Sequence, residues 1–102
     1  MAERLDLGQP RRIHVVGVGG AGMSAIATVL ADMGHTVTGS DLKSSPALER
    51  LRTRGLEVTV GHAAENLGDV DAVTISTAVP ATNVEVVAAR ERGIAVLRRA
   101  DA

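Results

Sequence analysis

Four glycines crowd into six positions of this chain, in the run Gly-Val-Gly-Gly-Ala-Gly at residues 17–22. Gly17, Gly19 and Gly22 have the spacing G-x-G-x-x-G, in which backbone amides and the positive end of a following helix bind a phosphate. The first glycine permits a tight turn, the second lets the phosphate approach the backbone, and the third lets helix and strand pack closely. A glycine-rich turn can also serve packing alone, so the neighbouring elements must decide between the two interpretations.

A predicted strand precedes the glycine run and a predicted helix follows it. The segment 12–16, Arg-Ile-His-Val-Val, is rich in β-branched residues and leads directly into the run. Apolar residues then recur at helical spacing over 23–33, up to Gly34, which is suited to end a helix. This strand–glycine–helix context favours phosphate binding.

An acidic residue, Asp41, follows the next predicted strand, 35–39. A carboxylate at this place can accept two hydrogen bonds from a ribose diol. Because Gly39 and Ser40 separate the apolar part of the strand from Asp41, we expect the carboxylate to lie slightly further out than in the usual dinucleotide pattern. Asp41 could instead cap a helix or remain a solvated loop charge.

Strand-like and helix-like segments alternate along the rest of the chain. Two residue pairs mark helix starts: Ser45-Pro46 supplies an N-cap followed by proline, and Thr82 with Glu85 fits a capping box. We therefore predict strands at 12–16, 35–39, 56–60, 71–76 and 94–97, helices at 22–33, 46–54 and from 82 to about 92, and one turn of helix near 63–67.

This alternation predicts an α/β fold. Because crossover connections are right-handed, we expect a Rossmann-like, doubly wound, parallel five-stranded sheet in the order 3-2-1-4-5. Residues 1–11 would form an N-terminal tail and residues 12–102 a single domain.

The predicted strand order also predicts where a ligand binds. The first and fourth strands are neighbours whose connections leave toward opposite faces, and ligands bind in the crevice that this creates. The loops 17–22 and 76–80 border that crevice. The ends of the second and third strands, at Ser40-Asp41 and Gly61-His62, lie along the same rim.

The histidines and arginines indicate a binding role less clearly than the glycine run and Asp41 do. For His62 on the rim, a binding role and a structural role are both open, whereas His14 in a strand and His35 after a helix are expected to be structural. The three are too scattered for a zinc site, so we predict no metal site. The pairs Arg11-Arg12 and Arg98-Arg99 are expected to be solvated or to contact another domain.

The composition of the 102-residue chain narrows the function classes. Its formal net charge of -1 gives no reason to expect nucleic acid or a membrane as a partner, and its N-terminal segment has no signal-peptide core. The absence of cysteine suits a cytoplasmic location. The one lysine, Lys43, is not part of a G-x-x-x-x-G-K-[ST] loop, and no nucleophile–base pair is visible, so we predict no catalytic residue. The residues alone therefore predict a domain that binds a nucleotide or a nucleotide sugar.

Two longer segments resemble a known family. The segment IHVVGVGGAGMSAIATVLADMGHTVTGSD, the segment STAVPATNVEVVAARERGIAVLRRADA and the Gly61-His62 pair are similar to the N-terminal, UDP-substrate-binding domain of the Mur ligases. The similarity runs from about residue 11 to residue 102. Within the family, it is greatest to the members that join L-alanine to UDP-N-acetylmuramate.

The resemblance implies that the domain binds UDP-N-acetylmuramate. The loops 19–24 and 76–79 would face the diphosphate and the sugar, Asp41 would hold the uridine ribose, and Leu42 and His62 would lie near the uracil. The expected binding residues are Gly17, Gly19, Gly20, Ala21, Gly22, Met23, Ser24, Ser40, Asp41, Leu42, His62, Ser76, Thr77, Ala78 and Val79.

The resemblance also implies a reaction in peptidoglycan precursor synthesis. Members of the family use ATP and magnesium to form an acyl phosphate on the muramoyl carboxylate, which the amine of L-alanine then attacks. Their ATP-binding and C-terminal domains lie in later sequence. We therefore expect this segment to need no cofactor of its own and to be inactive alone.

Three alternatives stay open at this point. The glycine run and the acidic residue also occur in NAD(P)-binding domains of oxidoreductases. A non-catalytic domain that senses a nucleotide would need the same residues. A related ligase attaches a preformed peptide to the same UDP-sugar, and the peptide is chosen in domains outside this segment. The sequence does not fix the oligomeric state.

Overall fold

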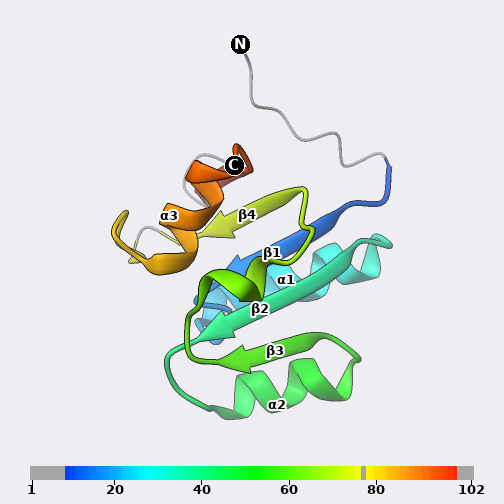
Figure 1. The fold of residues 1–102 in the computed structure, drawn as a ribbon. Coiled ribbons are helices and arrows are strands. Elements are labelled where there is room, and N and C mark those ends of the chain that lie inside the picture. Colours follow the sequence, from blue (N-terminus) through cyan, green and yellow to red (C-terminus); the bar gives the residue numbers. More distant parts are fainter. Residues whose placement is uncertain (1–8, 77, 99–102) are drawn as a thin grey trace.

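Five parallel strands form the centre of the fold in the computed structural model, which describes residues 9–76 and 78–98, apart from the side chain of Ala21 (Figure 1). The sheet has the order β3-β2-β1-β4-β5, which confirms the predicted topology. The strands are β1 (Arg12–Val16), β2 (Thr36–Asp41), β3 (Glu57–Val60), β4 (Ala72–Ile75) and β5 (Ala95–Arg98).

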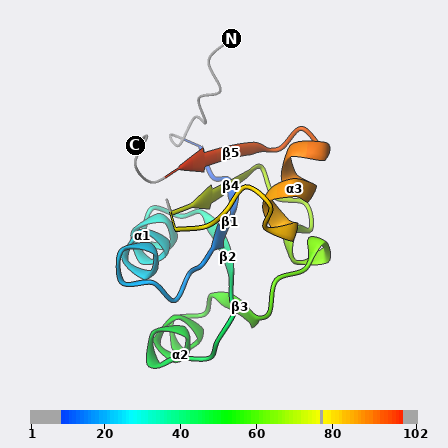
Figure 2. The ribbon, with the colours of Figure 1, turned by 90° about the vertical axis from the view of Figure 1, so that its left-hand side faces the viewer.

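Helices cover both faces of the sheet. Figure 2 shows α1 and α2 on one side and α3 with the short 3-10 helix η1 on the other. No helix among the described residues has the length and apolar character that crossing a bilayer requires. The helices are α1 (Ala21–Asp32), α2 (Pro46–Thr53), η1 (Ala64–Leu67) and α3 (Val84–Glu91).

Alternation along the strands divides the core into two apolar clusters. Val15 of β1 packs into the cluster that includes residues of α1 and α2, whereas Val16 packs into the cluster under α3. The same alternation in β2 turns Val37 toward α1 and α2. Successive strand side chains point to opposite faces, so Thr38 and Ser40 face α3 and Asp41 faces the opposite side.

Most local signals have the predicted effect. The Ser45 side chain caps α2 by accepting a hydrogen bond from the Leu48 amide, and η1 forms at the predicted turn of helix. The capping box of Thr82 and Glu85 was wrong, because Asn83 is the N-cap of α3 and its side chain accepts from the Glu85 amide at 2.8 Å. The Glu85 side chain turns away from the helix end into the protein.

Strand β2 ends two residues later than predicted, at Asp41 instead of Gly39. It pairs with β1 as far as Ser40 and with β3 as far as Asp41. Gly39 is required inside it, since a Cβ there would lie 2.7 Å from the Cβ of Val18 and within 2.9 Å of both its methyl carbons. Gly39 and Ser40 are therefore strand residues, and Asp41 is the last residue of the strand.

We predict that Gly39→Ala lowers the free energy of unfolding by about 1–3 kcal/mol, because the new methyl group overlaps the buried Val18 side chain. The measurement is urea denaturation of both proteins. Gly20→Ala is the matched control: the φ of Gly20 is -65°, and a Cβ there would lie 3.4 Å from the carbonyl oxygen of Gly17, so the substitution should cost less than about 1 kcal/mol. Equal effects of the two substitutions would contradict the close approach of Val18.

Candidate functional site

All five strands end at one edge of the sheet, which we call the carboxyl edge. There β1 and β4 are neighbours, and the helices that follow them, α1 and α3, lie on opposite faces (Figure 2). A methyl group on Gly17, which follows β1, would lie 3.5 Å from Cγ2 of Val79, which follows β4. The two loops therefore meet at the point where this fold class binds ligands.

The loop after β1, residues 17–20, is the glycine loop. Gly17 has a φ of +76°, which turns the chain sharply off the strand. The amides of Gly17 and Val18 donate to the carbonyl oxygen of Ser40 at 2.8 and 3.0 Å, which ties the loop to β2. Gly20 then caps α1 without a side-chain hydrogen bond. The first amides of α1 thus face the carboxyl edge, where a helix N-terminus favours an anion.

Asp41 lies against the glycine loop. Its Oδ2 accepts a hydrogen bond from the Gly19 amide at 2.8 Å, and its Oδ1 accepts one from the Leu42 amide at 2.7 Å. A Cβ at Gly19 would lie 2.7 Å from Oδ2, so only glycine permits this contact. The loop amide at Gly19 is therefore oriented to bind an anionic oxygen, and in this structure the oxygen is that of Asp41.

At the start of α1, backbone groups are more accessible to a ligand than side chains are. Met23 is 3% exposed and packs in the core between the sheet and α1, so its side chain points away from the carboxyl edge. Gly22 and Ser24 are half-buried, and the Ser24 amide donates to the Gly20 carbonyl at 2.8 Å. Of these residues, a ligand at the edge would meet chiefly the first-turn backbone.

The loop after β4 is a tight turn. The amides of Ala78 and Val79 donate to the side-chain and backbone oxygens of Ser76, at 3.3 and 3.2 Å. Val79 also packs against the apolar cluster under α3. The predicted contact at Thr77 lies outside the described residues.

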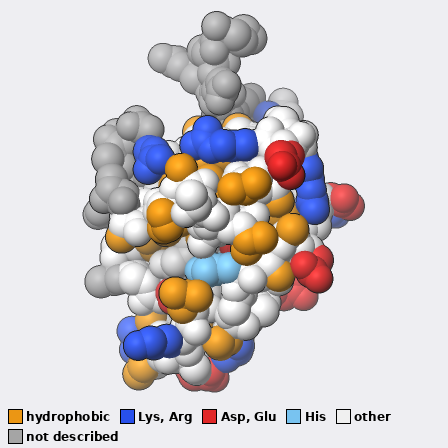
Figure 3. All heavy atoms as spheres, turned by 60° about the vertical axis from the view of Figure 1, so that its left-hand side comes forward, with side chains coloured by type: hydrophobic (Ala, Val, Ile, Leu, Met, Phe, Trp, Pro, Cys, Tyr) orange, Lys and Arg blue, Asp and Glu red, His pale blue; other side chains and the backbone are white. Residues whose placement is uncertain are grey.

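His62 lies at the end of β3, on the rim of the carboxyl edge. Its Nδ1 is 2.9 Å from Oγ of Ser40, and 12% of its side chain is exposed. The neighbouring strand ends add exposed apolar side chains, Leu42 at 70% and Val60 at 45%. Figure 3, which turns this edge toward the viewer, shows a histidine side chain at the surface between hydrophobic ones. The rim could therefore hold a flat apolar ring with polar edges.

A buried carboxylate behind the rim was missed by the sequence analysis. The Glu85 side chain is fully buried, and its Oε1 accepts from Oγ of Ser40 at 2.5 Å and lies 2.9 Å from Nε2 of His14. Its Oε2 accepts from Nδ2 of Asn66 at 2.6 Å and from the Ala63 amide at 3.1 Å. This one group thus connects α3 to β1, β2 and the segment of η1.

Hydrogen bonding keeps Glu85 ionised. Burial by itself raises the pKa of this carboxyl, but hydrogen bonds from His14, Ser40 and Asn66 and the charge of His14 outweigh it and lower the pKa from 4.5 to about 2. The side chain therefore acts only as an acceptor at neutral pH. A sequence signal did exist: His14, Thr38 and Ser40 put polar groups on one face of two central strands, where a buried partner is required.

The other two histidines lie away from the rim. His14 is 1% exposed, and its Nδ1 lies 2.7 Å from Oγ1 of Thr38 on the adjacent strand. His35 precedes β2 and accepts a hydrogen bond from the Arg11 amide at its Nδ1, at 3.0 Å. Both histidines thus have the structural roles that were expected of them.

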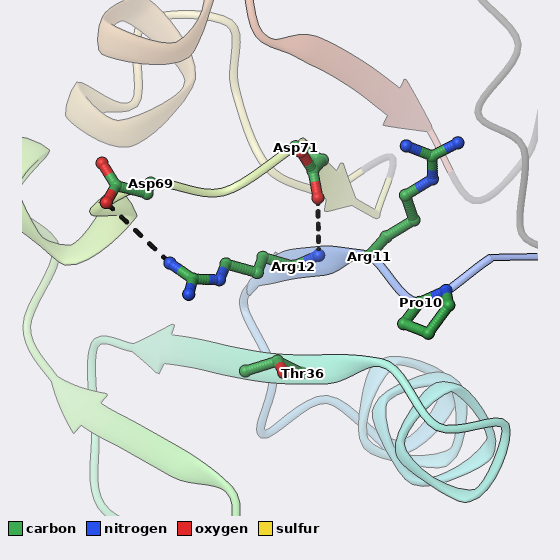
Figure 4. A pocket seen from close by; sticks show the side chains of 6 residues that line it. All are labelled: Pro10, Arg11, Arg12, Thr36, Asp69 and Asp71. Carbon is green, nitrogen blue, oxygen red and sulfur yellow. Dashed lines mark hydrogen bonds and ion pairs between the residues drawn. The ribbon is translucent and has the colours of Figure 1, made fainter.

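Another group of charged side chains lies at the opposite, amino edge of the sheet. There Arg12 pairs with Asp69 at 3.8 Å, and its amide donates to Asp71 at 2.8 Å, in a shallow depression (Figure 4). Arg98, in contrast, ends β5 at the carboxyl edge, and Arg99 lies outside the described residues. Within residues 9–76 and 78–98, no three His, Cys, Asp or Glu side chains are grouped to hold a metal ion.

Comparison with known proteins gives consistent matches. The family model described as "Mur ligase family, catalytic domain" matches residues 12–102. A UDP-N-acetylmuramate–L-alanine ligase of Dechloromonas aromatica is 62% identical over 90 residues, which are 88% of this chain and 19% of that protein.

Two solved structures are similar as well. A UDP-N-acetylmuramate–alanine ligase of Thermotoga maritima has a TM-score of 0.85 at 37% identity, over 88% of this chain and 21% of that one. A murein peptide ligase of Psychrobacter arcticus has a TM-score of 0.78 at 26% identity, over 84% of this chain and 18% of that one. The chain spans about a fifth of the length of the proteins it matches.

The lowered pKa of Glu85 predicts a pH-dependent stability. Its contribution to the free energy of unfolding is present above pH 4.5 and is lost as the pH falls from 4.5 to about 2, and it amounts to roughly 3 kcal/mol. Glu85→Gln should therefore be less stable than the wild type at pH 7, and the difference should shrink below pH 4.5. Urea denaturation of the two proteins between pH 7 and pH 2.5 measures the stability difference at neutral pH and its decrease in acid.

Glu57→Gln is the control for this measurement, because the Glu57 side chain is exposed at the start of β3 and takes no part in the network of Glu85. It should follow the wild type at every pH. A difference between wild type and Glu85→Gln that stays constant down to pH 2.5 would contradict the assigned ionisation.

Proposed function

Because the chain belongs to the Mur ligase family, we propose that its carboxyl edge binds UDP-N-acetylmuramate. The observation that carries the proposal is the contact of the Gly19 amide with the Asp41 carboxylate at 2.8 Å. A backbone donor that binds one anionic oxygen is suited to a diphosphate oxygen, and the released carboxylate is suited to a ribose diol. The relatives named UDP-N-acetylmuramate–L-alanine ligase support this choice of ligand.

The proposed contacts follow the order of the strand ends. The glycine loop and the first turn of α1, residues 19–24, bind the diphosphate with backbone amides and the helix N-terminus. Asp41 binds the ribose. Leu42 and His62, at the ends of β2 and β3, contact the base. The sugar lies beside the loop after β4, at Ser76, Thr77, Ala78 and Val79.

Ser40 has a supporting place in this arrangement. It is fully buried, and its hydroxyl oxygen lies 2.5 Å from Oε1 of Glu85, 2.9 Å from Nδ1 of His62 and 3.3 Å from Nε2 of His14. Its carbonyl oxygen holds the glycine loop. Ser40 therefore acts on the ligand through the loop and through His62.

For the whole protein, we propose the ATP-dependent ligation of L-alanine to UDP-N-acetylmuramate, in the cytoplasm. Neither ATP nor magnesium fits the described residues, which hold no cluster of metal ligands and no lysine within a phosphate-binding loop. This chain's own part is to hold the UDP end of the substrate. The 37% identity to the alanine ligase, against 26% to the peptide ligase, favours L-alanine over a preformed peptide.

We predict that the chain binds UDP-N-acetylmuramate or UDP but not NADH. The proposed contacts suit a uridine diphosphate, and the family match favours that ligand over a dinucleotide. Calorimetric titration of the chain with UDP-N-acetylmuramate, UDP and NADH measures the difference. Tighter binding of NADH would contradict the proposed function.

We also predict that Asp41→Ala weakens UDP binding by roughly 1.5–3 kcal/mol, the scale of hydrogen bonds to a charged acceptor. Asp71→Ala is the matched control, because Asp71 also accepts a backbone amide, that of Arg12 at 2.8 Å, but at the amino edge. Its UDP affinity, measured by the same titration, should equal that of the wild type. An unchanged affinity of Asp41→Ala would remove Asp41 from the site.

A further inference from the structure

The hydroxyl of Ser40 has its single proton committed. It donates that proton to Oε1 of Glu85 at 2.5 Å, because the ionised carboxylate can only accept. Its oxygen lies 2.9 Å from Nδ1 of His62 and can take part in that hydrogen bond only as the acceptor. Nδ1 of His62 must therefore carry a proton.

A second observation places the proton on the same nitrogen. Oε1 of Glu85 lies 3.5 Å from Nδ1 of His62, so a full negative charge sits beside that atom. A nearby carboxylate favours a proton on the ring nitrogen that faces it. When the ring is neutral, its other nitrogen, Nε2, then has a free lone pair and acts as an acceptor.

Nε2 faces the carboxyl edge. Among the described residues, no hydrogen-bond partner is found for it, and the His62 side chain is 12% exposed on the rim. Exposed Leu42 follows β2 and exposed Val60 ends β3, so the same rim offers apolar contact to a flat ring. A base bound beyond the ribose site at Asp41 would meet this acceptor.

We propose that Glu85, acting through Ser40, holds His62 in the Nδ1–H tautomer so that Nε2 accepts a hydrogen bond from an N–H group of the bound base. Glu85 is a positioning residue in this scheme and touches no ligand. The inference rests on the proposed function and adds a basis for selecting the base. Uracil presents an N–H group at N3, whereas cytosine presents a lone pair there, so the acceptor favours uridine over cytidine nucleotides.

The substitution Glu85→Gln should change Nε2 of His62 from a hydrogen-bond acceptor into a donor. Oε2 of Glu85 faces two donors, Asn66 and the Ala63 amide, so the glutamine turns its oxygen to them and its amino group toward Ser40. The amino group has two protons, so it donates to Ser40 and to Nε2 of His14, which becomes an acceptor. Ser40 then donates to Nδ1 of His62. The ring is driven into the Nε2–H tautomer, which offers a donor to the base.

The test combines two measurements on the whole chain. Two-bond ¹H–¹⁵N correlation spectra in alkaline buffer show which nitrogen of each histidine carries the proton, without a ligand. Titrations with UDP and with CDP give the ratio of their dissociation constants. For the wild type, we expect the Nδ1–H tautomer of His62 and roughly tenfold tighter binding of UDP than of CDP. For Glu85→Gln, we expect the Nε2–H tautomer and dissociation constants for UDP and CDP that are equal or in the reverse order.

Thr38→Val is the matched control. It removes a hydroxyl that contacts the same network at His14, 2.7 Å from Nδ1, but it leaves the path from Glu85 to His62 intact. It should keep both the tautomer of His62 and the preference for UDP. If Glu85→Gln does not fold, Ser40→Ala serves instead, and should give mixed tautomers and at least a threefold lower preference.

The outcomes separate this inference from the proposed function. An Nε2–H tautomer in the wild type, an unchanged tautomer in Glu85→Gln, or a changed tautomer with an unchanged UDP-to-CDP ratio would overturn the role of Glu85 while UDP binding stands. Loss of the preference in Thr38→Val would overturn it as well, because the effect would then be general destabilisation. A wild-type chain that binds neither nucleotide would overturn both.

Discussion

The buried carboxylate of Glu85 is the interaction on which the carboxyl edge depends. It accepts hydrogen bonds from groups on β1, β2 and the segment of η1 while it belongs to α3. A buried charge is tolerated only when its acceptor sites are filled, so the positions of these elements are coupled. The strand ends that would hold a ligand are thereby fixed before any ligand binds.

Side chains alternate along β2, so neighbouring residues at its end have different roles on the two faces of the sheet. Ser40 faces α3 and joins the network of Glu85, whereas Asp41, the next residue, faces the glycine loop. The end of β2 thus positions His62 through Ser40 and places the Asp41 carboxylate beside the glycine loop. The close approach of Val18 to Gly39 brings loop and strand together, so packing and ligand geometry come from the same residues.

Much of the fold could be predicted from the sequence, because its signals are local. Helix stops at glycine, the Ser45 cap and the strand–helix alternation led to the observed sheet order. The role of Glu85 could not be predicted, since its partners are up to 71 residues distant and its spacing from Thr82 also fits a helix cap. The end of β2 was missed because glycine usually marks the end of a strand, whereas Gly39 is required inside this one by its contact with Val18, and pairing with β3 continues to Asp41.

The central claim is that the carboxyl edge, and not the amino edge, binds the UDP-sugar. Amide chemical shifts recorded during a titration with UDP-N-acetylmuramate test it most directly. We expect saturable shifts at Gly19, Leu42 and His62, with little change at Arg12 and Gly55 on the opposite edge. Shifts that centre on the amino edge, or none at all at millimolar ligand, would contradict it.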